Sequence, residues 1–280
     1  MRIDLHTHTK FSDGTDAPSE LMLKAAHAKL DVVGVADHDT IDGWNEAANF
    51  VKTSGVSLVR GMEISSLYDG HDVHVLGILF NPDDATVQLH INTMKNARQL
   101  RAQKIVELLS ADFLISWDDV LQAAATSKSI GRPHIADALV SKGIVKNRDE
   151  AFARLLHTSS PYYVPQIAPS TIQAIDMIKS AGGRAILAHP KAVKRGYSLS
   201  DDAIREFAQA GLFGIEIDHR DNPPSQRPVL KKLAKELGLA RFGASDYHGT
   251  GKPNTLGEGL TAQEVFETAI EGTYLEVLHP

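Results

Sequence analysis

The sequence contains no cysteine, and this absence restricts the chemistry that its 280 residues can perform. Disulfide bonds, thiolate metal sites and cysteine nucleophiles are all excluded. Any metal ion must therefore be held by imidazole and carboxylate groups, a ligand set that suits zinc, manganese or iron. The sequence does not choose among these three metals.

The chain also lacks long apolar runs and blocks of basic residues. No apolar run approaches the roughly 20 residues that a membrane helix needs, and the first expected strand begins at residue 3, which leaves no room for a signal peptide. The formal net charge of −6 argues against a broad electrostatic grip on duplex nucleic acid. We therefore expect a cytoplasmic protein whose partner is neither a membrane nor duplex nucleic acid. A small phosphorylated ligand stays compatible with this composition, and the oligomeric state is left open.

Short apolar segments and helical patterns alternate along most of the chain. The expected strands cover residues 3–8, 31–37, 56–62, 73–79, 184–188, 213–217 and 240–245. Helical patterns lie between several of them, at residues 18–29, 41–54, 170–181, 200–210 and 225–237. Alternation of strand and helix indicates parallel βα units, and about seven of them favour a barrel over an open sheet. The predicted fold class is therefore α/β, with a (βα) barrel.

One stretch, from about residue 84 to 168, breaks this rhythm. It carries helical patterns at residues 84–111, 117–126, 133–141 and 148–157 and no convincing strand. We interpret it as a helical insertion that caps the active-site face of the barrel. The predicted division is a barrel of residues 1–90 and 169–280, with a capping insertion of residues 91–168.

The most informative motif is His6-Thr7-His8, because two imidazoles at alternate positions of a strand point the same way and can hold one metal ion. Functional residues of a βα barrel lie where the strands end. Other histidines and carboxylates occur at or near such positions: Asp13, His38, Glu63, His74, His189, Asp246 and His248. His74 fits less neatly, because it lies early in the fourth expected strand. Without metal, such a cluster would bury charge at a cost of several kcal/mol per group.

These residues carry a resemblance to the polymerase-and-histidinol-phosphatase (PHP) domain family, over nearly the whole chain. The matching motifs are Asp4-Leu5-His6-Thr7-His8, Ser12-Asp13-Gly14, Asp37-His38-Asp39, Glu63, His74, His189-Pro190 and Ser245-Asp246-Tyr247-His248-Gly249. The resemblance implies a distorted seven-stranded βα barrel that holds two or three divalent metal ions.

The resemblance also implies a ligand assignment. One metal would be held by His6, His8, Glu63 and Asp246. A second would be held by Asp13, His38 and His248. Glu63 would bridge to a third, held also by His74 and His189. Some members of the family carry histidine in place of Asp13, so the number of metals stays open, and Asp4 and Asp37 are expected to orient imidazoles from behind.

A second motif, Gly131-Arg132-Pro133-His134, opens a predicted helix. Proline favours the first helical position, which would leave Arg132 at the cap and His134 one residue inside. Free backbone N–H groups and a guanidinium would then converge on an anion. The segment resembles the Arg-x-His element of the PHP subgroup that hydrolyses nucleotide phosphates. We therefore count Arg132 and His134 as catalytic and substrate-binding residues, together with Asp246 as catalytic.

Weaker candidates for contact with the substrate lie in two other loops. His219 follows the sixth expected strand, and Lys191 follows the His189-Pro190 pair. Lys194 and Arg195 extend the same loop. Each of these residues is also explained by an ordinary solvated or structural side chain.

The combined prediction is a metal-dependent phosphoric ester hydrolase. A hydroxide bridging two metals would attack phosphorus in line while Arg132 neutralises phosphoryl oxygens. The resemblance narrows the substrate to small nucleotides, first nucleoside 3′,5′-bisphosphates or the 5′ ends of short oligoribonucleotides, with an AMP-like product. The alternatives are a histidinol-phosphate phosphatase, a carbon–nitrogen hydrolase and a non-catalytic metal-binding sensor.

Overall fold

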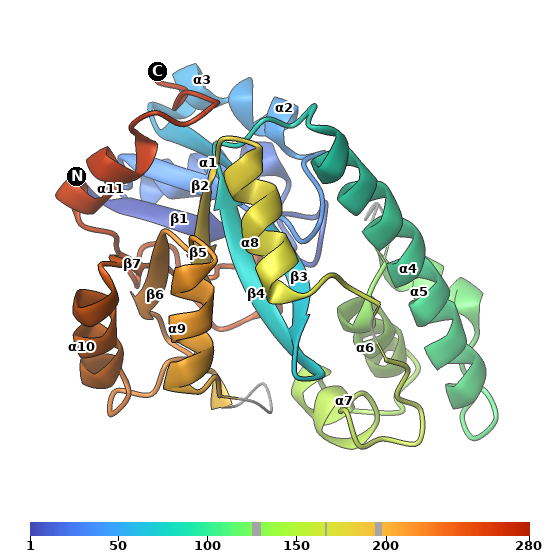
Figure 1. The fold of residues 1–280 in the computed structure, drawn as a ribbon. Helices are drawn as coiled ribbons and strands as arrows, with labels where there is room; N and C mark the ends of the chain where they lie inside the picture. Colours follow the sequence, from blue (N-terminus) through green and yellow to red (C-terminus); the bar gives the residue numbers. More distant parts are fainter. Residues whose placement is uncertain (125–129, 166, 194–197) are drawn as a thin grey trace.

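Seven strands in sequence order form one sheet that curls into a nearly closed barrel (Figure 1). The computed structural model describes residues 1–124, 130–165, 167–193 and 198–280. The strands are β1 Ile3–Thr7, β2 Val32–Val35, β3 Ser57–Tyr68, β4 His71–Ile78, β5 Arg184–Leu187, β6 Gly214–Asp218 and β7 Ala240–Gly243. The predicted α/β barrel is therefore confirmed.

The direction of β4 departs from the expectation of parallel strands. β4 pairs antiparallel with both β3 and β5. The cause is a tight hairpin at Asp69-Gly70, where both residues have positive φ angles of 49° and 75°. Asp-Gly is a strong signal for such a turn. β3 is also longer than predicted, because it continues through this hairpin to Tyr68.

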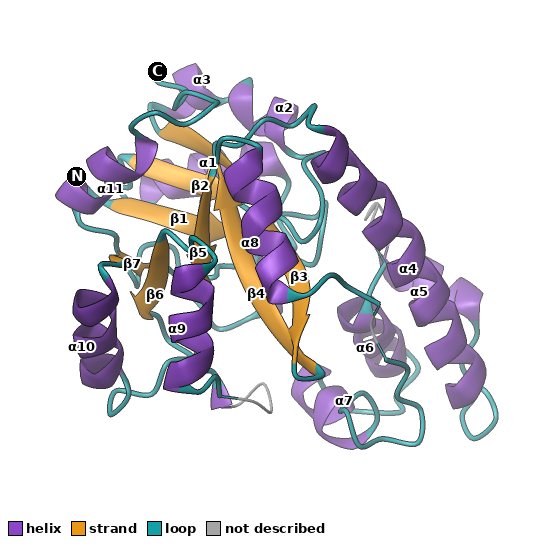
Figure 2. Cartoon of the chain, viewed as in Figure 1, coloured by secondary structure: helices purple, strands orange, loops and turns teal. Residues whose placement is uncertain are grey.

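The outer surface of the barrel is covered by helices (Figure 2). They are α1 Pro18–His27, α2 Trp44–Ala48, α3 Val51–Ser54, α8 Thr171–Ser180, α9 Asp201–Gln209, α10 Arg227–Leu237 and α11 Gln263–Ile270. The single helix predicted at residues 41–54 is wrong, because Phe50 N–H bonds to the Ala47 carbonyl, three residues back, and the helix is interrupted there. Ser170 caps α8 and accepts a hydrogen bond from Gln173 N–H at 3.2 Å.

Buried apolar side chains hold these layers together. One cluster packs the sheet against the outer helices and includes Val35, Ile64, Ile178, Phe207 and Leu230. A second cluster joins residues of β1 to β5 and β7 with α11. The strands therefore form a rigid frame, and side chains at one end of it are held in fixed positions.

The stretch predicted as an insertion is helical. It contains α4 Ala85–Leu109, α5 Trp117–Ala124, α6 Arg132–Ser141 and α7 Arg148–Arg154, which share a hydrophobic cluster of their own. α4 is 25 residues long, and the proposed boundary at residue 90 lies inside it. Figure 1 shows these helices beside the far end of the β3–β4 hairpin.

The two outer strands of the sheet, β1 and β7, do not pair directly in the described barrel. The chain segments at their carboxyl ends do meet. Thr7 and Tyr247 form an isolated parallel bridge, and His8 N–H donates to the Tyr247 carbonyl at 2.8 Å. Further down, Thr261 N–H donates to the Ile3 carbonyl at 2.9 Å, so a loop segment fills the gap between β1 and β7.

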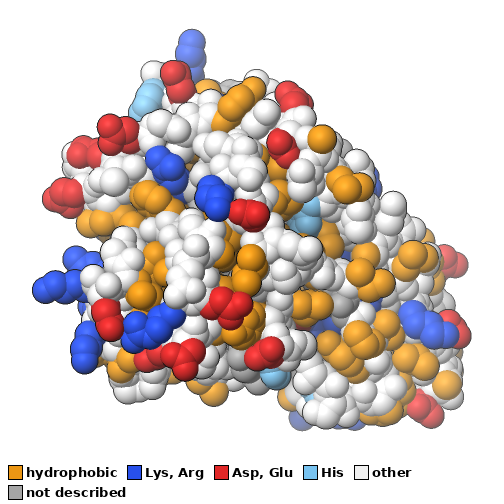
Figure 3. Space-filling view, viewed as in Figure 1, with side chains coloured by type: hydrophobic (Ala, Val, Ile, Leu, Met, Phe, Trp, Pro, Cys, Tyr) orange, Lys and Arg blue, Asp and Glu red, His pale blue; other side chains and the backbone are white. Residues whose placement is uncertain are grey.

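The molecular surface mixes charges of both signs. Figure 3 shows acidic and basic side chains interspersed over one face, with apolar side chains over the region of α4 and α5. Leu89 and Leu100 of α4 are among the exposed apolar residues. Within the described residues, no helix combines the length and the apolar character that a membrane span requires.

Candidate metal centre

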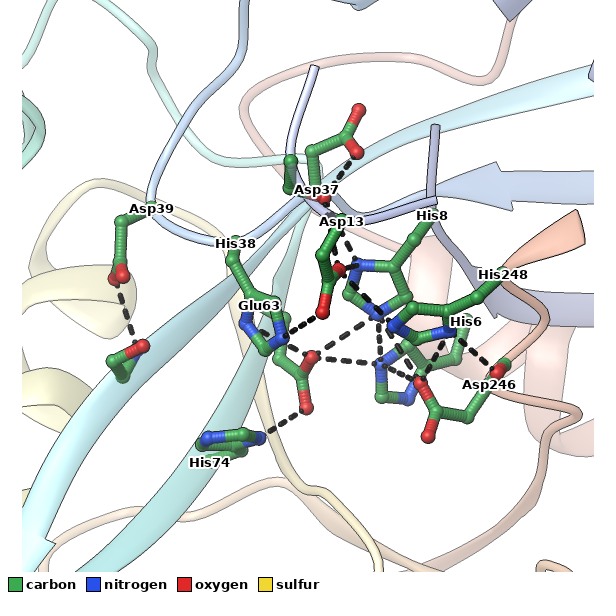
Figure 4. Close-up of polar contacts among 12 residues, drawn as sticks. His6, His8, Asp13, Asp37, His38, Asp39, Glu63, His74, Asp246 and His248 are labelled. Carbon is green, nitrogen blue, oxygen red and sulfur yellow. Dashed lines mark hydrogen bonds and ion pairs between the residues drawn. The ribbon is translucent and has the colours of Figure 1, made fainter. Parts of the chain in front are cut away.

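The predicted ligands converge at one end of the barrel (Figure 4). Imidazole and carboxylate atoms form three overlapping groups, each compact enough to surround an ion. The groups are His6, His8, Glu63 and Asp246; His8, Asp13, His38 and His248; and His38, Glu63 and His74.

The first group is almost completely buried. His6 Nε2 and His8 Nε2 lie 3.2 and 3.1 Å from the same oxygen of Glu63, Oε2. His8 Nε2 is also 3.2 Å from Asp246 Oδ1, and the two imidazole nitrogens are 3.1 Å apart. Four donor atoms from strands far apart in the sequence therefore face one point.

The second group lies beside the first and shares His8 with it. Asp13 Oδ1 is 3.1 Å from His248 Nε2 and 3.7 Å from His8 Nδ1. Asp13 Oδ2 is 3.9 Å from His38 Nε2. The Asp13 side chain is 16% exposed, so this part of the cluster is the more accessible one.

Glu63 connects the groups through its two oxygens. Oε2 faces His6 and His8, while Oε1 lies 2.8 Å from His74 Nδ1 and 3.1 Å from His189 Nε2. A carboxylate divided in this way has the geometry of a bridging ligand. The sequence predicted that Glu63 follows a strand of residues 56–62, but Glu63 lies inside the longer β3.

The direction of β4 explains the position of His74. His74 lies near the beginning of its strand, whereas ligands of parallel strands lie at the end. Because β4 runs antiparallel to β3, its beginning is at the metal-binding edge, and Ser65 of β3 pairs with His74 there. The antiparallel strand β4 therefore carries its ligand near its amino end, whereas the parallel strands carry theirs near their carboxyl ends.

Several buried atoms of the cluster fit a metal. Among the described residues, His38 Nδ1, Glu63 Oε2 and His248 Nε2 have no hydrogen-bond partner of good geometry, although ion-pair distances of 3.1–3.2 Å join them to neighbouring groups. Two ligands bound about 2.1 Å from one ion are separated by about 3.0–3.4 Å. The donor atoms therefore have the spacing of ligands, and the set of imidazole and carboxylate donors suits zinc, manganese or iron.

The pKa values in the cluster are strongly perturbed. Burial lowers the pKa of His8, but the adjacent carboxylates of Asp246 and Glu63 outweigh it and raise that pKa to about 9. Burial lowers the pKa of His248 to about 4, against the opposing attraction of Asp13. Neighbouring imidazoles with pKa values shifted in opposite directions are typical of a functional site.

Three further buried carboxylates support the cluster from behind, and the sequence analysis missed the most direct one. Glu216 of β6 lies 2.8 Å from His6 Nδ1 and accepts a hydrogen bond from His189 N–H at 3.0 Å. The available signal was a lone charged residue within the apolar strand at residues 214–217.

Asp4 and Asp37 were expected to orient imidazoles, but their hydrogen bonds go to loops. Asp37 accepts from Ser12 Oγ at 2.6 Å, and Ser12 in turn lies 3.3 Å from His8 Nδ1. Asp4 accepts from Ser245 N–H at 3.1 Å and so fixes the segment just before Asp246. Both carboxylates therefore act on the ligands indirectly.

The Arg132–His134 element lies at the start of α6, shifted by one position from the prediction. Gly131 is the N-cap and Arg132 is the first helical residue. His134 is 7% exposed, and its Nδ1 accepts a hydrogen bond from Gly131 N–H at 3.1 Å. Burial lowers the pKa of His134, and the charge of Asp13 opposes that shift.

Arg132 has weak partners. Its guanidinium is 3.5 Å from Asp72 Oδ2, donates to the Leu156 carbonyl at 3.3 Å, and lies over the Phe152 ring. The side chain remains 23% exposed. Arg132 can therefore exchange a long ion pair for a phosphate group.

The weaker candidates have different positions. Lys191 is buried, and its Nζ donates to the Leu199 carbonyl and lies 3.0 Å from Asp201, so its charge is engaged within the protein. His219 is 1% exposed, and its Nε2 lies 3.9 Å from Asp246 Oδ2. Lys194 and Arg195 lie outside the described residues.

The sequence is similar to those of known nucleotide-directed enzymes. The chain is 32% identical over 247 residues to a 5′-3′ exoribonuclease of Haemophilus influenzae, covering 88% of this chain and 90% of the relative. It is 30% identical over 251 residues to a 3′,5′-nucleoside bisphosphate phosphatase of Chromobacterium violaceum, covering 89% and 88% of the two chains.

Solved structures extend the likeness to three dimensions. A protein of Bifidobacterium adolescentis, predicted to be a metal-dependent phosphoesterase, superposes with a TM-score of 0.92 at 40% identity, covering 96% of this chain and 95% of that one. An amidohydrolase of Chromobacterium violaceum with bound sulfate gives a TM-score of 0.84 at 28% identity, covering 95% and 93%. The family model of the PHP domain matches residues 4–218, and the chain therefore belongs to the PHP domain family.

Proposed function

We propose that this protein is a metal-dependent phosphoesterase that hydrolyses phosphate monoesters of small nucleotides. The preferred substrates are nucleoside 3′,5′-bisphosphates or the 5′ ends of short oligoribonucleotides, as the names of the two relatives suggest. The observation that carries this proposal is the divided Glu63 carboxylate, which joins histidines of three groups at one end of the barrel. The cytoplasm, where nucleotides turn over, is the proposed location.

The residues of the cluster would hold two or three divalent ions of manganese, zinc or iron. His6, His8, Glu63 and Asp246 would bind one ion. Asp13, His38 and His248 would bind a second, and His74 and His189 would join Glu63 around a third. Bound ions of this kind lower the pKa of water and polarise phosphoryl oxygens.

The chain's own cations would bind and orient the phosphate ester. Arg132 has a bidentate fork suited to phosphoryl oxygens, and its present partner Asp72 is 3.5 Å away. His134 lies two residues further along the first turn of α6 and can hold a proton for the leaving alcohol. Both residues come from the insertion, so the proposal assigns substrate choice to residues 91–168.

The proposed place for the nucleoside is a cavity between the His38 loop and α4. It has a volume of about 200 Å³ and is lined by Phe11, Asp39, Gln88, Asn92 and Arg98 among others. Phe11 is two residues from Asp13, and Asp39 follows His38, so two of the lining residues are close in sequence to ligands of the second group. An aromatic ring combined with amide side chains suits a nucleobase.

A substrate panel tests this function. Protein purified with manganese should release phosphate from a nucleoside 3′,5′-bisphosphate, or 5′-mononucleotides from a short 5′-phosphorylated oligoribonucleotide, faster than it releases phosphate from histidinol phosphate. An amide panel run in parallel tests the carbon–nitrogen hydrolase alternative, which has no use for Arg132. His6→Ala should abolish activity, while His27→Ala, an exposed histidine of α1, should leave it unchanged. Metal binding without turnover of any ester or amide would favour a sensor instead.

A further inference from the structure

The carboxylate of Asp246 has two different environments. Oδ1 faces the ligand cluster, 3.2 Å from His8 Nε2 and 3.6 Å from His6 Nε2. Oδ2 faces the other way, 3.0 Å from Nζ of Lys252. Asp246 is 1% exposed, whereas the Lys252 side chain is 31% exposed. A lysine cation therefore lies between a predicted metal ligand and solvent.

The local backbone holds Lys252 in this place. Asp246 and Gly249 both have positive φ angles, 53° and 66°, and a short 3₁₀ turn at Gly249–Gly251 reverses the chain toward Asp246. Asn254 Nδ2 donates to the Ser245 carbonyl at 2.7 Å and ties the returning segment to the beginning of the loop. Lys252 is thus fixed at both sides rather than extended from a loose surface loop.

This loop contacts α7 of the proposed insertion and the loop that carries Asp13. Arg148 of α7 donates to the Gly251 carbonyl at 3.4 Å and is paired with Asp137 at 2.6 Å. The position of a Cβ on Gly251 would be 3.6 Å from the Asp13 carbonyl oxygen. Lys252 therefore follows a residue that touches both the insertion and the loop carrying Asp13, at the partly exposed side of the centre.

We propose that Lys252 is a phosphate-binding residue of this centre, donating to a phosphoryl oxygen while it remains bonded to Asp246 Oδ2. A lysine ammonium has three donors, and one contact with Asp246 leaves donors for a ligand at the exposed side. Three carboxylates of the cluster reduce the positive charge that bound metals present to a dianionic ester, and Lys252 restores one unit of it. This inference rests on the proposed phosphoesterase function.

The test measures binding of inorganic phosphate to manganese-loaded protein by calorimetry. Lys252→Met should raise the Kd for phosphate about 10- to 100-fold, the effect of losing a charge-assisted hydrogen bond. Lys252→Arg keeps the charge and the donors and should recover most of the affinity. Metal content and circular dichroism of each variant establish that the centre and the fold are intact.

Lys24→Met is the matched control. Lys24 pairs with Asp16 at 2.6 Å, and Asp16 also accepts from the Tyr247 hydroxyl, so this pair adjoins the same loop without touching a ligand. Its phosphate affinity should stay within about twofold of the wild type.

Two outcomes would overturn the inference while leaving the phosphoesterase in place. One is wild-type phosphate affinity in Lys252→Met at full metal content. The other is a loss of phosphate binding that only follows a loss of metal, since Lys252 would then merely support Asp246. Wild-type protein that neither hydrolyses esters nor binds phosphate would overturn both proposals together.

Discussion

Glu216 Oε1 lies 2.8 Å from Nδ1 of His6, and its second oxygen accepts the backbone N–H of His189 at 3.0 Å. One buried carboxylate on β6 thus fixes the imidazole of a ligand on β1 and the backbone of a ligand after β5. A carboxylate behind a metal-bound histidine fixes the ring orientation and raises its basicity.

Glu216→Gln should therefore weaken metal binding about 10- to 100-fold, because the amide keeps the shape of the side chain but loses its charge. The measurement is a metal titration of the metal-free protein. Asp218→Asn is the control, because Asp218 lies on the same strand but is exposed and pairs with the half-exposed Lys231 at 3.5 Å. Equal affinity in the Glu216 and Asp218 variants would contradict a role for Glu216.

Removing Glu63 should cost more metal than removing Asp13. Glu63 contacts histidines of all three groups, whereas Asp13 belongs to one of them. We expect at least two ions per wild-type chain by elemental analysis and a larger loss in Glu63→Ala than in Asp13→Ala. Full metal content and full activity in the Glu63 variant would contradict its bridging role.

Metal binding should release protons at neutral pH. His8 must be neutral to bind an ion, yet its pKa in the metal-free protein is raised to about 9 by Asp246 and Glu63 against the effect of burial. Apparent metal affinity should therefore rise up to about tenfold per pH unit between pH 7 and 9. Calorimetry in buffers of different ionisation enthalpy measures the released protons, and identical heats would contradict this expectation.

The same shift gives the metal-free protein a characteristic pH dependence. A histidine whose folded pKa lies above its unfolded value contributes stability that is fully present below about pH 6.5 and is lost as the pH rises through about 9. The melting temperature of metal-free protein should therefore fall over this range. Metal-loaded protein, in which His8 carries no titrating proton, should show a smaller change.

Arg132→Ala should lower kcat/KM for a nucleotide bisphosphate about 10- to 150-fold while metal content stays unchanged. Arg132→Lys should recover only part of the loss, because lysine lacks the bidentate fork. His134→Asn should slow esters with poor leaving groups more than an activated aryl phosphate. If both kinds of ester slow equally, His134 has no role as an acid.

Asp39 should be important for attachment of α4 to the barrel. Its carboxylate is 1% exposed, bonds to Arg98, and lies 2.8 Å from His90 Nε2, so both helix residues depend on it. Asp39→Ala should reduce the free energy of unfolding by about 3–5 kcal/mol, because it leaves the largely buried Arg98 without its carboxylate partner. Urea unfolding measures the loss, and Asp42→Ala, an exposed residue of the same loop, should change stability little.

The ligands could be predicted from the sequence because their signals are local. His6 lies in β1 and His8 directly follows that strand, and the alternation of side chains brings both imidazoles to one face. Glu216 could not be assigned in the same way, because its partner His6 is 210 residues away and the contact exists only after the barrel forms.

The ion-pair partners of the two loop lysines could not be predicted from the sequence either. Lys191 and Lys252 both follow predicted ligands closely, yet Lys191 is paired with Asp201 and Lys252 with Asp246. Spacing along the chain does not distinguish these pairs, because each depends on how a loop turns back. The β3–β4 hairpin, in contrast, has a local signal in the sequence, the Asp69-Gly70 pair. The expectation that all strands are parallel left no place for this hairpin.

The isolated bridge between Thr7 and Tyr247 leaves the first and last strands of the barrel weakly joined. His6 and His8 lie on one side of this seam, and Asp246 and His248 lie on the other. A metal ion bound by ligands from both sides would crosslink the first and last strands of the barrel. Binding energy would then appear as folding stability. Metal supply would govern how long each molecule survives in the cell as well as how fast it works.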